Sequence, residues 1–265
     1  MSSGKLFVDA VSRVFPAVRE GQPVRALEPT TLSVAANDFI TILGPSGCGK
    51  STLLRIVAGL DRPSAGRVLL DGRPVTGPGP DRGMVFQSYT LFPWLTVAEN
   101  IAFGLKEKRM APAEMRERVA QYVASVGLRG FENHYPRQLS GGMQQRTAIA
   151  RALANDPEIL LLDEPFGALD NQTRGLMQEL LLGIWERERK TVLFVTHDIE
   201  EAIFMASRVV VMTARPGRIK ADIPVDLPYP RHYTIKTSAA FSDLRARLTE
   251  EIRAEAVAAE QGAAV

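Results

Sequence analysis

The order of apolar and polar residues predicts strands in the N-terminal part of the chain. KLFVDAV (5–11), TTLSVAA (30–36) and FITILG (39–44) are short runs rich in strand-forming residues. A polar stretch that contains proline, residues 16–25, separates the first two runs, and GRVLLDGRPV (66–75) has the pattern of a hairpin. We therefore expect this part of the molecule to consist mainly of strands.

Helical periodicity replaces the strand pattern after Gln87. Thr96 and Glu99 fit a capping box at the start of a helix over VAENIAFGL. A second helix is predicted to end at Gly127, and its apolar face consists of Met115, Val119, Tyr122 and Val126. Residues 88–155 are therefore predicted to form a helical insert.

Strand-like runs return at EILLLDEP (158–165) and TVLFVTH (191–197), and a helical stretch over 171–189 lies between them. This alternation of strand, helix and strand predicts a parallel sheet. After a proline-rich segment, a last helix is predicted from apolar residues at helical spacing: Phe241, Leu244, Leu248 and Ile252. The whole pattern indicates an α/β protein.

Composition limits the classes of partner. The chain has 265 residues, which is long for one domain and short for two independent ones. Its net charge of +2 gives no electrostatic signature for nucleic acid, and its longest apolar runs fall far below the roughly 18 residues that a membrane helix requires. The N-terminal residues lack the pattern of a secretory signal, so we expect a cytosolic protein. A single cysteine, Cys48, excludes an internal disulfide.

One segment has the spacing of a phosphate-binding loop. GPSGCGKS fits the pattern G-x-x-x-x-G-K-[ST] with Gly44, Gly49, Lys50 and Ser51. A predicted strand leads into it and a helix over 50–58 follows, so backbone N–H groups and a helix N-terminus face one place. An ordinary glycine-rich turn is the alternative, and the flanking strand and helix argue against it. The predicted phosphate-binding residues are Gly44, Pro45, Ser46, Gly47, Cys48, Gly49, Lys50, Ser51 and Thr52.

The side chains of this loop have separate expected roles. Lys50 is expected to neutralise the β- and γ-phosphate oxygens, and Ser51 to offer its hydroxyl to Mg²⁺. Thr52 can reach the α-phosphate. Cys48 occupies a position of the loop where the pattern allows any residue, and we expect it to fill space rather than to react.

Two carboxylates end the predicted strand in ILLLDEP. Asp163 and Glu164 lie where α/β proteins bind their ligands, at the carboxyl edge of the sheet. Asp163 is expected to hold the Mg²⁺ shell and Glu164 to polarise a water for attack on the γ-phosphorus. A base directly after the Mg²⁺ carboxylate points to hydrolysis. Two solvated carboxylates at a strand end are the alternative interpretation.

Two further polar residues also follow predicted strands. His197 comes after TVLFVT and is expected to donate a hydrogen bond to the γ-phosphate. Gln87 comes after GMVF and is expected to contact Mg²⁺ or the attacking water. A single histidine is more often structural, and its place at a strand end beside the other candidates favours a functional role.

A second candidate anion site lies in RQLSGGMQQRTAIARAL. Ser140 fits the N-cap of a helix over 141–154, and Gly141 and Gly142 leave the first N–H groups of that helix open to an anion. Each glycine weakens a helix by about 1 kcal/mol relative to alanine, so we expect a reason for bare backbone here. A glycine-weakened helix start in an ordinary bundle is the alternative.

Together these segments resemble an ATP-binding cassette ATPase. GPSGCGKST is similar to the Walker A motif of that family, Gln87 to its Q-loop and LSGGMQQR to its signature motif. ILLLDEP is similar to the Walker B motif, GALD (167–170) to the D-loop and His197 to the H-loop. The order and spacing match up to about residue 225.

The resemblance implies a fold and a division of the chain. The fold is a P-loop NTPase core of the RecA-like type with a mainly parallel sheet, an N-terminal antiparallel β subdomain and an inserted α-helical subdomain. Residues 1–87 and 156–225 are expected to form the ATP-binding core with the antiparallel subdomain. Residues 88–155 are expected to form the helical subdomain with the signature motif, and 226–265 a C-terminal helical tail.

The resemblance also implies ATP and Mg²⁺ as cofactors and a head-to-tail homodimer. Catalytic roles fall to Glu164, His197, Gln87 and Lys50, and metal contacts to Ser51, Gln87 and Asp163. In that family the signature motif grips the nucleotide of the other subunit, which assigns Ser140, Gly141, Gly142 and Gln144 to the partner's ATP. Asp170 of the D-loop joins the nucleotide site, and Phe15 is expected to stack on the adenine, although a core phenylalanine is the alternative.

Residues 87–105 (QSYTLFPWLTVAENIAFGL) carry a dense aromatic cluster. Importer cassettes receive a helix of the membrane permease in the matching region, so Phe92 and Trp94 are candidate anchors, with core packing as the alternative. LFPWLTVAENIAFGL and MTARPGRI resemble cassettes of the nitrate, sulfonate and taurine importers. The expected partners are therefore integral membrane permease subunits and, indirectly, an extracytoplasmic solute-binding protein. The expected location is the cytoplasmic face of the inner membrane.

Three alternatives stay open at this point. The first alternative is the ATPase subunit of an exporter, because exporter cassettes belong to the same family. A soluble cassette ATPase that acts on nucleic acid usually carries a coiled coil, a zinc module or a second cassette, so we expect no nucleic-acid partner. A phosphate-loop kinase or GTPase would make LSGGMQQR accidental, and the N-K-x-D guanine motif of a GTPase is missing from the sequence.

Overall fold

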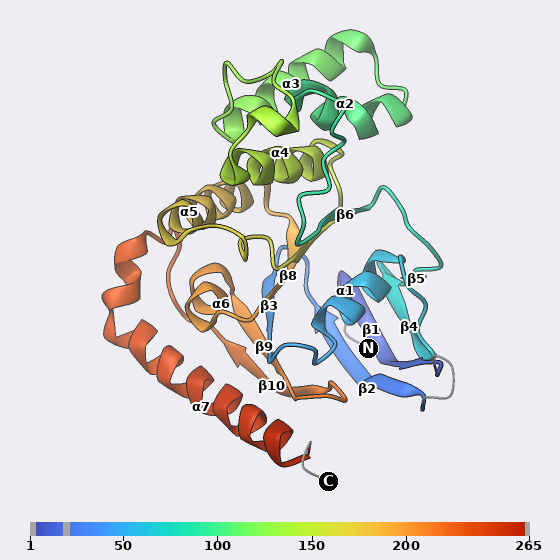
Figure 1. The fold of residues 1–265 in the computed structure, drawn as a ribbon, viewed down its shortest axis with the longest axis vertical. Helices are drawn as coiled ribbons and strands as arrows, with labels where there is room; N and C mark the ends of the chain where they lie inside the picture. The colour runs from blue at the N-terminus through green and yellow to red at the C-terminus, as the bar shows by residue number, and fades with distance from the viewer. Residues whose placement is uncertain (1–3, 18–21, 263–265) are drawn as a thin grey trace. The chain divides into compact units, whose positions relative to one another are not determined.

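A computed structural model of the chain describes residues 4–17 and 22–262 and divides into two compact units (Figure 1). The first unit comprises residues 1–79 and 190–265, and the second comprises residues 80–189. Within the described ranges, no helix combines the length and the apolar character needed to cross a bilayer.

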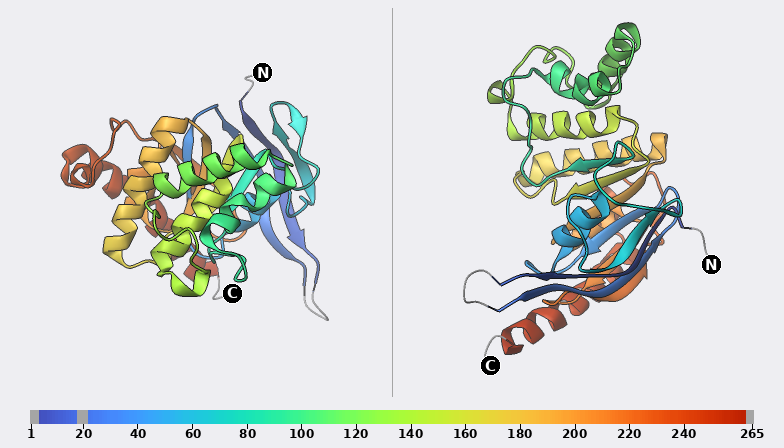
Figure 2. Two further views of the ribbon diagram at one scale, coloured as in Figure 1. Left: turned by 90° about the horizontal axis from the view of Figure 1, so that it is seen from above. Right: turned by 90° about the vertical axis from the view of Figure 1, so that its right-hand side faces the viewer.

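The first unit contains an antiparallel sheet with the strand order β2-β1-β4-β5, whose two longest strands, β1 and β2, run side by side in Figure 2. Its strands are β1 (Leu6–Phe15), β2 (Val24–Val34), β4 (Ala65–Leu70) and β5 (Arg73–Pro74). Leu6, Val8 and Val11 of β1 are fully buried, and a register shift between Val8 and Val11 interrupts the pairing with β2. The predicted hairpin over 66–75 is confirmed as the antiparallel pair β4–β5.

A second set of strands in the same unit has the order β10-β9-β3-β8. Its members are β3 (Phe39–Leu43), β8 (Thr191–Thr196), β9 (Arg208–Met212) and β10 (Ile219–Pro224). β3 runs parallel to both β8 and β9, whereas β10 is antiparallel to β9. Every residue of β3 and β8 is buried, as expected for parallel strands covered on both faces.

The helices of the first unit are α1 (Lys50–Ala58), α6 (Ile199–Met205) and α7 (Ala239–Gly262), with a short 3₁₀ segment, η2 (Tyr233–Thr237). Gly59 ends α1 as predicted, with a positive φ of 75°. On the predicted apolar face of α7, Phe241 and Leu248 are fully buried. The last predicted helix is therefore confirmed.

The second unit combines a parallel strand pair, β6 (Arg82–Val85) and β7 (Ile159–Asp163), with helices. The helices are α2 (Val97–Glu107), α3 (Pro112–Ser125), η1 (Pro136–Gln138), α4 (Gly141–Ala154) and α5 (Asn171–Glu188). The capping box of α2 is confirmed, because Thr96 Oγ1 accepts the Glu99 N–H at 3.3 Å and Glu99 Oε2 accepts the Thr96 N–H at 2.8 Å.

The start of one strand differs from the sequence predictions. β2 begins at Val24, six residues before the predicted run and inside the stretch 16–25 that was expected to be irregular; residues 18–21 of that stretch lie outside the described residues. The second compact unit contains α2, α3 and α4 together with β6, β7 and α5. The domain limits inferred from the sequence stay a prediction.

Candidate functional site

The phosphate loop of the first unit joins a buried strand to a helix. β3 ends at Leu43, and α1 begins at Lys50 with Gly49 as its N-cap in the left-handed conformation, at a φ of 101°. No side chain caps this helix start. The N-terminus of α1 thus presents backbone N–H groups and the positive end of its dipole, which together suit a phosphate.

Glycine is required in this loop by close backbone contacts. A Cβ on Gly49 would lie 2.7 Å from Leu27 Cδ2 and 2.9 Å from the Ala26 carbonyl oxygen. A Cβ on Gly44 would lie 2.9 Å from Cys48 Sγ, and Cys48 is 1% exposed. Cys48 therefore fills space beneath the loop, as predicted.

Lys50 is the charged group of the loop. It is 4% exposed, and its Nζ donates to the carbonyl oxygens of Gly44 at 2.8 Å and Pro45 at 3.0 Å. A buried ammonium group at a helix start that carries further N–H donors fits an oligophosphate, because burial strengthens its attraction to a multiply charged anion. The residues present therefore fit the expected triphosphate, and the Ser51 hydroxyl oxygen would be the ligand for a magnesium ion.

His197 lies at the same edge of the parallel strands as the phosphate loop. Leu43 of β3 is paired with Thr196 of β8, so Gly44 and His197 are each the next residue beyond a paired position. Asp198 directly after it caps α6 by accepting the Glu201 N–H at 2.9 Å. The first unit thus brings the phosphate loop and His197 to one sheet edge.

Phe15 lies at the far end of β1, where it pairs with Val24. The ring is partly exposed, and the Arg13 guanidinium lies 4.5 Å from its centroid. This contact holds the ring by a cation–π interaction. An adenine-stacking role stays a prediction.

The second unit brings its own candidates to one sheet edge. β6 and β7 are parallel with Val85 paired to Leu162, so Gln87, two residues after β6, and Asp163, the last residue of β7, lie at the same end of the strand pair. Asp163 is 4% exposed. Glu164 has a φ of 43°, a left-handed conformation that is costly for a residue with a side chain, and such strain is concentrated at functional positions.

The signature segment begins α4. Ser140 is its N-cap as predicted, and its hydroxyl accepts the Met143 N–H at 3.3 Å. A Cβ on Gly141 would lie 2.9 Å from the Tyr89 hydroxyl, and one on Gly142 would lie 2.7 Å from Thr173 Cγ2. Side-chain atoms therefore lie close to both glycines.

Two polar residues of the signature and D-loop segments hold local backbone. Gln144 Nε2 donates to the carbonyl oxygens of Pro136 at 3.1 Å and Leu139 at 3.3 Å. Asp170 caps α5 by accepting the N–H groups of Gln172 and Thr173. The bond from the Thr173 N–H lowers the pKa of Asp170 below its usual value.

An exposed aromatic cluster follows Gln87 in the second unit. Trp94 is 69% exposed, and its ring centroid lies 5.6 Å from that of Phe92, which in turn lies 4.4 Å from that of Phe103. Arg151 lies 5.4 Å from the Phe92 ring centroid and donates to the Thr90 carbonyl at 2.9 Å. The predicted anchors Phe92 and Trp94 thus belong to one surface, to which Phe103 adds.

Asn100 supports this cluster and was not identified from the sequence. It is fully buried in α2. Its Oδ1 accepts the Phe92 N–H at 2.9 Å, and its Nδ2 donates to the carbonyl oxygens of Phe92 and Leu95 at 3.2 and 2.9 Å. An asparagine on an otherwise apolar helix face was the available signal.

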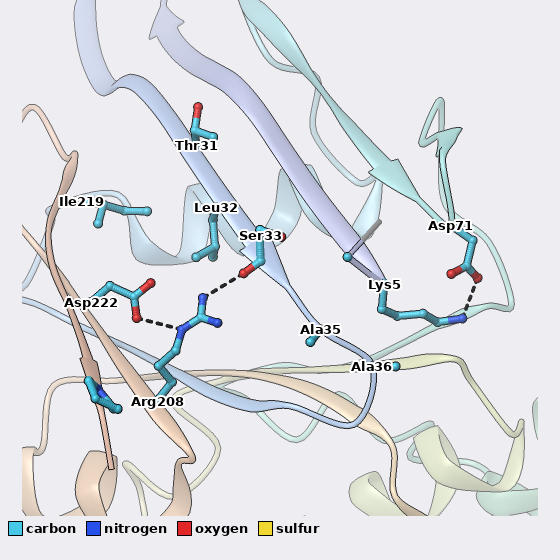
Figure 3. A pocket seen from close by; sticks show the side chains of 12 residues that line it. Lys5, Thr31, Leu32, Ser33, Ala35, Ala36, Asp71, Arg208, Ile219 and Asp222 are labelled. Carbon is cyan, nitrogen blue, oxygen red and sulfur yellow. Dashed lines mark hydrogen bonds and ion pairs between the residues drawn. The ribbon is translucent and has the colours of Figure 1, made fainter. Parts of the chain in front are cut away.

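A cavity of about 610 Å³ in the first unit lies beside β1, β2, β9 and β10 (Figure 3). Its charged side chains pair with one another: Lys5 Nζ lies 2.6 Å from Asp71, and Arg208 Nε lies 2.7 Å from Asp222. None of its lining residues belongs to the phosphate loop.

The chain is similar to known proteins that are described as parts of ABC transporters. A family model described as ABC transporter matches residues 27–167. An uncharacterized ABC transporter ATP-binding protein of Methanocaldococcus jannaschii is 54% identical over 251 residues, which cover 95% of this chain and 92% of that protein. An aliphatic sulfonates import ATP-binding protein of Bacillus cereus is 48% identical over 246 residues, which cover 92% and 94% of the two chains.

Solved structures give the same result. The dimeric post-hydrolysis state of an ATP-binding cassette bound to ADP and phosphate has a TM-score of 0.74 at 36% identity, and the match covers 84% of this chain and 100% of that chain. A component of an ABC transporter complex of Clostridium perfringens has a TM-score of 0.74 at 27% identity, covering 84% and 90%. These likenesses confirm the predicted P-loop NTPase fold. With a family match over more than half of its length and a 54% identical relative along nearly all of it, the chain belongs to the ABC transporter family as an ATP-binding subunit that hydrolyses ATP.

Proposed function

We propose that this chain is the ATPase subunit of an importer that takes up a small anionic or zwitterionic solute, similar to nitrate, a sulfonate or taurine, through a partner permease. The observation that supports this most directly is the 48% identity, over 92% of the chain, with a protein named for aliphatic sulfonate import. The exposed aromatic cluster gives the chain a surface suited to such a partner.

The proposed roles within the ATP site are those that the sequence motifs predict. Residues 44–52 bind the phosphates, with Lys50 neutralising their charge. Ser51, Gln87 and Asp163 hold a magnesium ion, which supplies further charge neutralisation when it is bound. The other catalytic side chains are Glu164, which accepts a proton from the attacking water, and His197, which donates a hydrogen bond to the γ-phosphate.

The complete ATP site is proposed to need two copies of the chain. Ser140, Gly141, Gly142 and Gln144 of one subunit contact the nucleotide held by the other, and Asp170 lies at the same interface. Solved cassettes that are 36% identical to this chain are described as dimers, which supports this arrangement. ATP then favours the closed dimer because it contacts both subunits, and hydrolysis removes that contact.

The proposed domain limits are those inferred from the sequence. Residues 1–87 and 156–225 form the ATP-binding core, with Phe15 against the adenine. Residues 88–155 form the helical subdomain, and 226–265 form the C-terminal tail.

The aromatic cluster Phe92, Trp94 and Phe103 is proposed as the anchor for the permease. Aromatic side chains that are exposed in the free subunit gain contact area when a partner covers them, and they dominate binding at interfaces. The subunit would then lie at the cytoplasmic face of the inner membrane through the permease, while a solute-binding protein acts on the opposite side. We expect no nucleic-acid partner.

Co-purification tests this proposal. The tagged full-length chain would be isolated from detergent-solubilised membranes of the cells that naturally produce it, and integral membrane proteins bound to it would be identified by mass spectrometry. We expect a permease with several membrane spans, and we expect Trp94→Ala to reduce its recovery at least about tenfold. Tyr233→Ala is the matched control, since Tyr233 is also a well-exposed aromatic residue, at 62%, but lies in the first unit.

Two results would contradict the proposal. Recovery of RNA or DNA without a membrane protein, lost at raised salt, would favour a soluble cassette ATPase that acts on nucleic acid. Equal recovery of the permease with Trp94→Ala and Tyr233→Ala would remove the aromatic cluster as the docking surface.

A further inference from the structure

The turn between β9 and β10, residues 213–218, lies directly on the phosphate loop. Arg215 Nε donates to the Gly47 carbonyl at 3.2 Å. A Cβ on Gly217 would lie 1.9 Å from the Cys48 carbonyl oxygen, so the two backbones touch. The Gly217 N–H also donates to the Ala26 carbonyl at 3.0 Å. The turn therefore supports the loop on the side of Gly47 and Cys48.

The same turn has a fixed conformation of its own. Thr213 is 9% exposed, and its hydroxyl accepts the Arg218 N–H at 3.1 Å and bonds to the Pro216 carbonyl at 3.2 Å. The Thr213 N–H donates to the Arg218 carbonyl at 2.9 Å. These bonds close the turn on itself, so the positions of its residues depend on one another.

The C-terminal helix α7 holds this turn from the other side. Glu255 Oε2 accepts the Ala214 N–H at 3.0 Å, and Ala214 precedes Arg215 in the chain. Glu255 Oε1 lies 2.9 Å from Lys220 Nζ, which also lies 3.1 Å from Glu251. Glu255 is 13% exposed, and α7 is fixed to the first unit by the fully buried Phe241 and Leu248.

We propose that Glu255 and Arg215 are positioning residues for the phosphate loop, so that α7 sets the affinity of the subunit for ATP. α7 fixes Ala214, the turn carries that constraint to Arg215 and Gly217, and these two hold the backbone of Gly47 and Cys48. Ordering a loop costs conformational entropy, and a loop that is already ordered binds its ligand more tightly. The proposal depends on ATP binding by this family and is independent of the permease.

The relevant contact is the hydrogen bond that Glu255 accepts from Ala214, rather than its charge. Glu255→Ala removes both the hydrogen bond and the ion pair with Lys220. Glu255→Gln keeps an oxygen that can accept the Ala214 N–H and removes the charge. Lys220→Ala removes the contacts of Lys220 with Glu255 and Glu251 and leaves the Ala214 hydrogen bond in place. Glu250→Ala is the matched control, because Glu250 is an exposed carboxylate of the same helix.

The test measures the affinity of each full-length variant for MgATP by calorimetry, together with KM and kcat for ATP hydrolysis and the melting temperature without nucleotide. We expect Glu255→Ala to raise Kd and KM for ATP about fivefold or more and to leave kcat within about twofold. Glu255→Gln, Lys220→Ala and Glu250→Ala should stay within about twofold of the unchanged chain.

Arg215→Ala tests the other end of the connection and removes an exposed side chain, so it stays informative even where Glu255→Ala unfolds. We expect Arg215→Ala to raise the Kd for MgATP by a similar factor. The double variant Arg215→Ala/Glu255→Ala should have a Kd no higher than that of the single variant that binds MgATP less tightly, because both substitutions act on one contact path.

Two outcomes would overturn the proposal. A lower melting temperature with unchanged Kd and KM would make Glu255 a purely structural residue. Equal effects of Glu255→Ala and Glu255→Gln would show that the hydrogen bond to Ala214 does not matter. Both are read on the ATPase alone, so neither affects the proposed import function.

Discussion

At the scale of single residues, the phosphate loop depends on backbone that only glycine adopts easily. Gly47 and Gly49 have φ values of 75° and 101°, and a side chain on Gly49 would overlap the Ala26 carbonyl. The shape of the loop is therefore fixed by covalent geometry and close packing before any nucleotide is considered. Lys50 adds the charge that selects an anion.

Substitution of a single glycine separates the effect of an unfavourable φ from the effect of close packing. Gly49→Ala combines an unfavourable φ with overlap against backbone, so we expect it to lower the free energy of unfolding by at least about 2 kcal/mol. Gly72→Ala is the matched control, because Gly72 has a φ of 74° but nothing within 4 Å of its Cβ position, and it should cost about 1 kcal/mol. Urea unfolding of both variants measures the difference. Equal losses would show that packing against β2 contributes nothing.

The residues whose roles could be predicted from the sequence interact with residues close to them in the chain. The phosphate loop, the cap at Ser140 and the capping box at Thr96 each depend on neighbours within a few positions, so their spacing alone identifies them. Arg215 could not be found in this way, because its partner Gly47 is 168 positions away in the chain. Asn100 was missed because its role depends on which loop folds over it.

At the scale of elements, several helices begin with a polar side chain that accepts backbone N–H groups. Asp170 caps α5 and Asp198 caps α6, while Glu99 and Thr96 cap α2 together. The bond from the Thr96 N–H lowers the pKa of Glu99, as the bond from the Thr173 N–H lowers that of Asp170. The starts of α2 and α5 are therefore stabilised by ionised carboxylates.

The caps predict a defined acid sensitivity. A carboxyl whose pKa is lower in the folded than in the unfolded state contributes stability above its ordinary pKa, and this stability is lost as the pH falls through the folded value. For Asp170, with an ordinary pKa of 3.8, we expect the advantage of the unchanged chain over Asp170→Asn to be constant between pH 7 and 5 and to shrink below about 4.

Urea unfolding at several pH values measures that difference, and taking the difference removes the acid effects that both chains share. Glu250→Gln, on the exposed side of α7, serves as the control. An advantage over Asp170→Asn that persists unchanged at pH 3 would rule out the charged cap as its source.

The residue pattern predicts the buried strands, but it does not predict the start of β2. β3, β7 and β8 are buried along their whole length, and their apolar runs predicted them directly. The start of β2 was missed because its first residues are exposed and follow proline, so nothing local marks them as a strand. Pairing with Phe15 and Val14 of β1 defines that part of β2, and this contact is visible only in three dimensions.

At the scale of the whole molecule, the chain carries two candidate phosphate-binding segments, one in each compact unit. The phosphate loop belongs to the first unit, and the signature segment belongs to the second. Two copies arranged head to tail would use both segments at each nucleotide. The match to dimeric cassettes supports this interpretation.

Glu164→Gln tests the shared site. It removes the proposed base and keeps the residues that bind, so we expect unchanged ATP affinity, a loss of hydrolysis of at least about 100-fold and a stable dimer with MgATP. Analytical ultracentrifugation with and without MgATP measures the association. Adding Ser140→Ala should weaken the dimer, whereas Glu250→Ala should not. A Glu164→Gln variant that stays monomeric in saturating MgATP would contradict the shared site.

The exposed position of Trp94 gives the protein a built-in optical reporter. The chain has two tryptophans, and the other, Trp185, is 4% exposed. Indole emission shifts to shorter wavelength when water is excluded, so the two residues should emit as separate red and blue components. A binding partner that covers Trp94 would move the red component alone, and Trp185 would serve as an internal reference within the same spectrum.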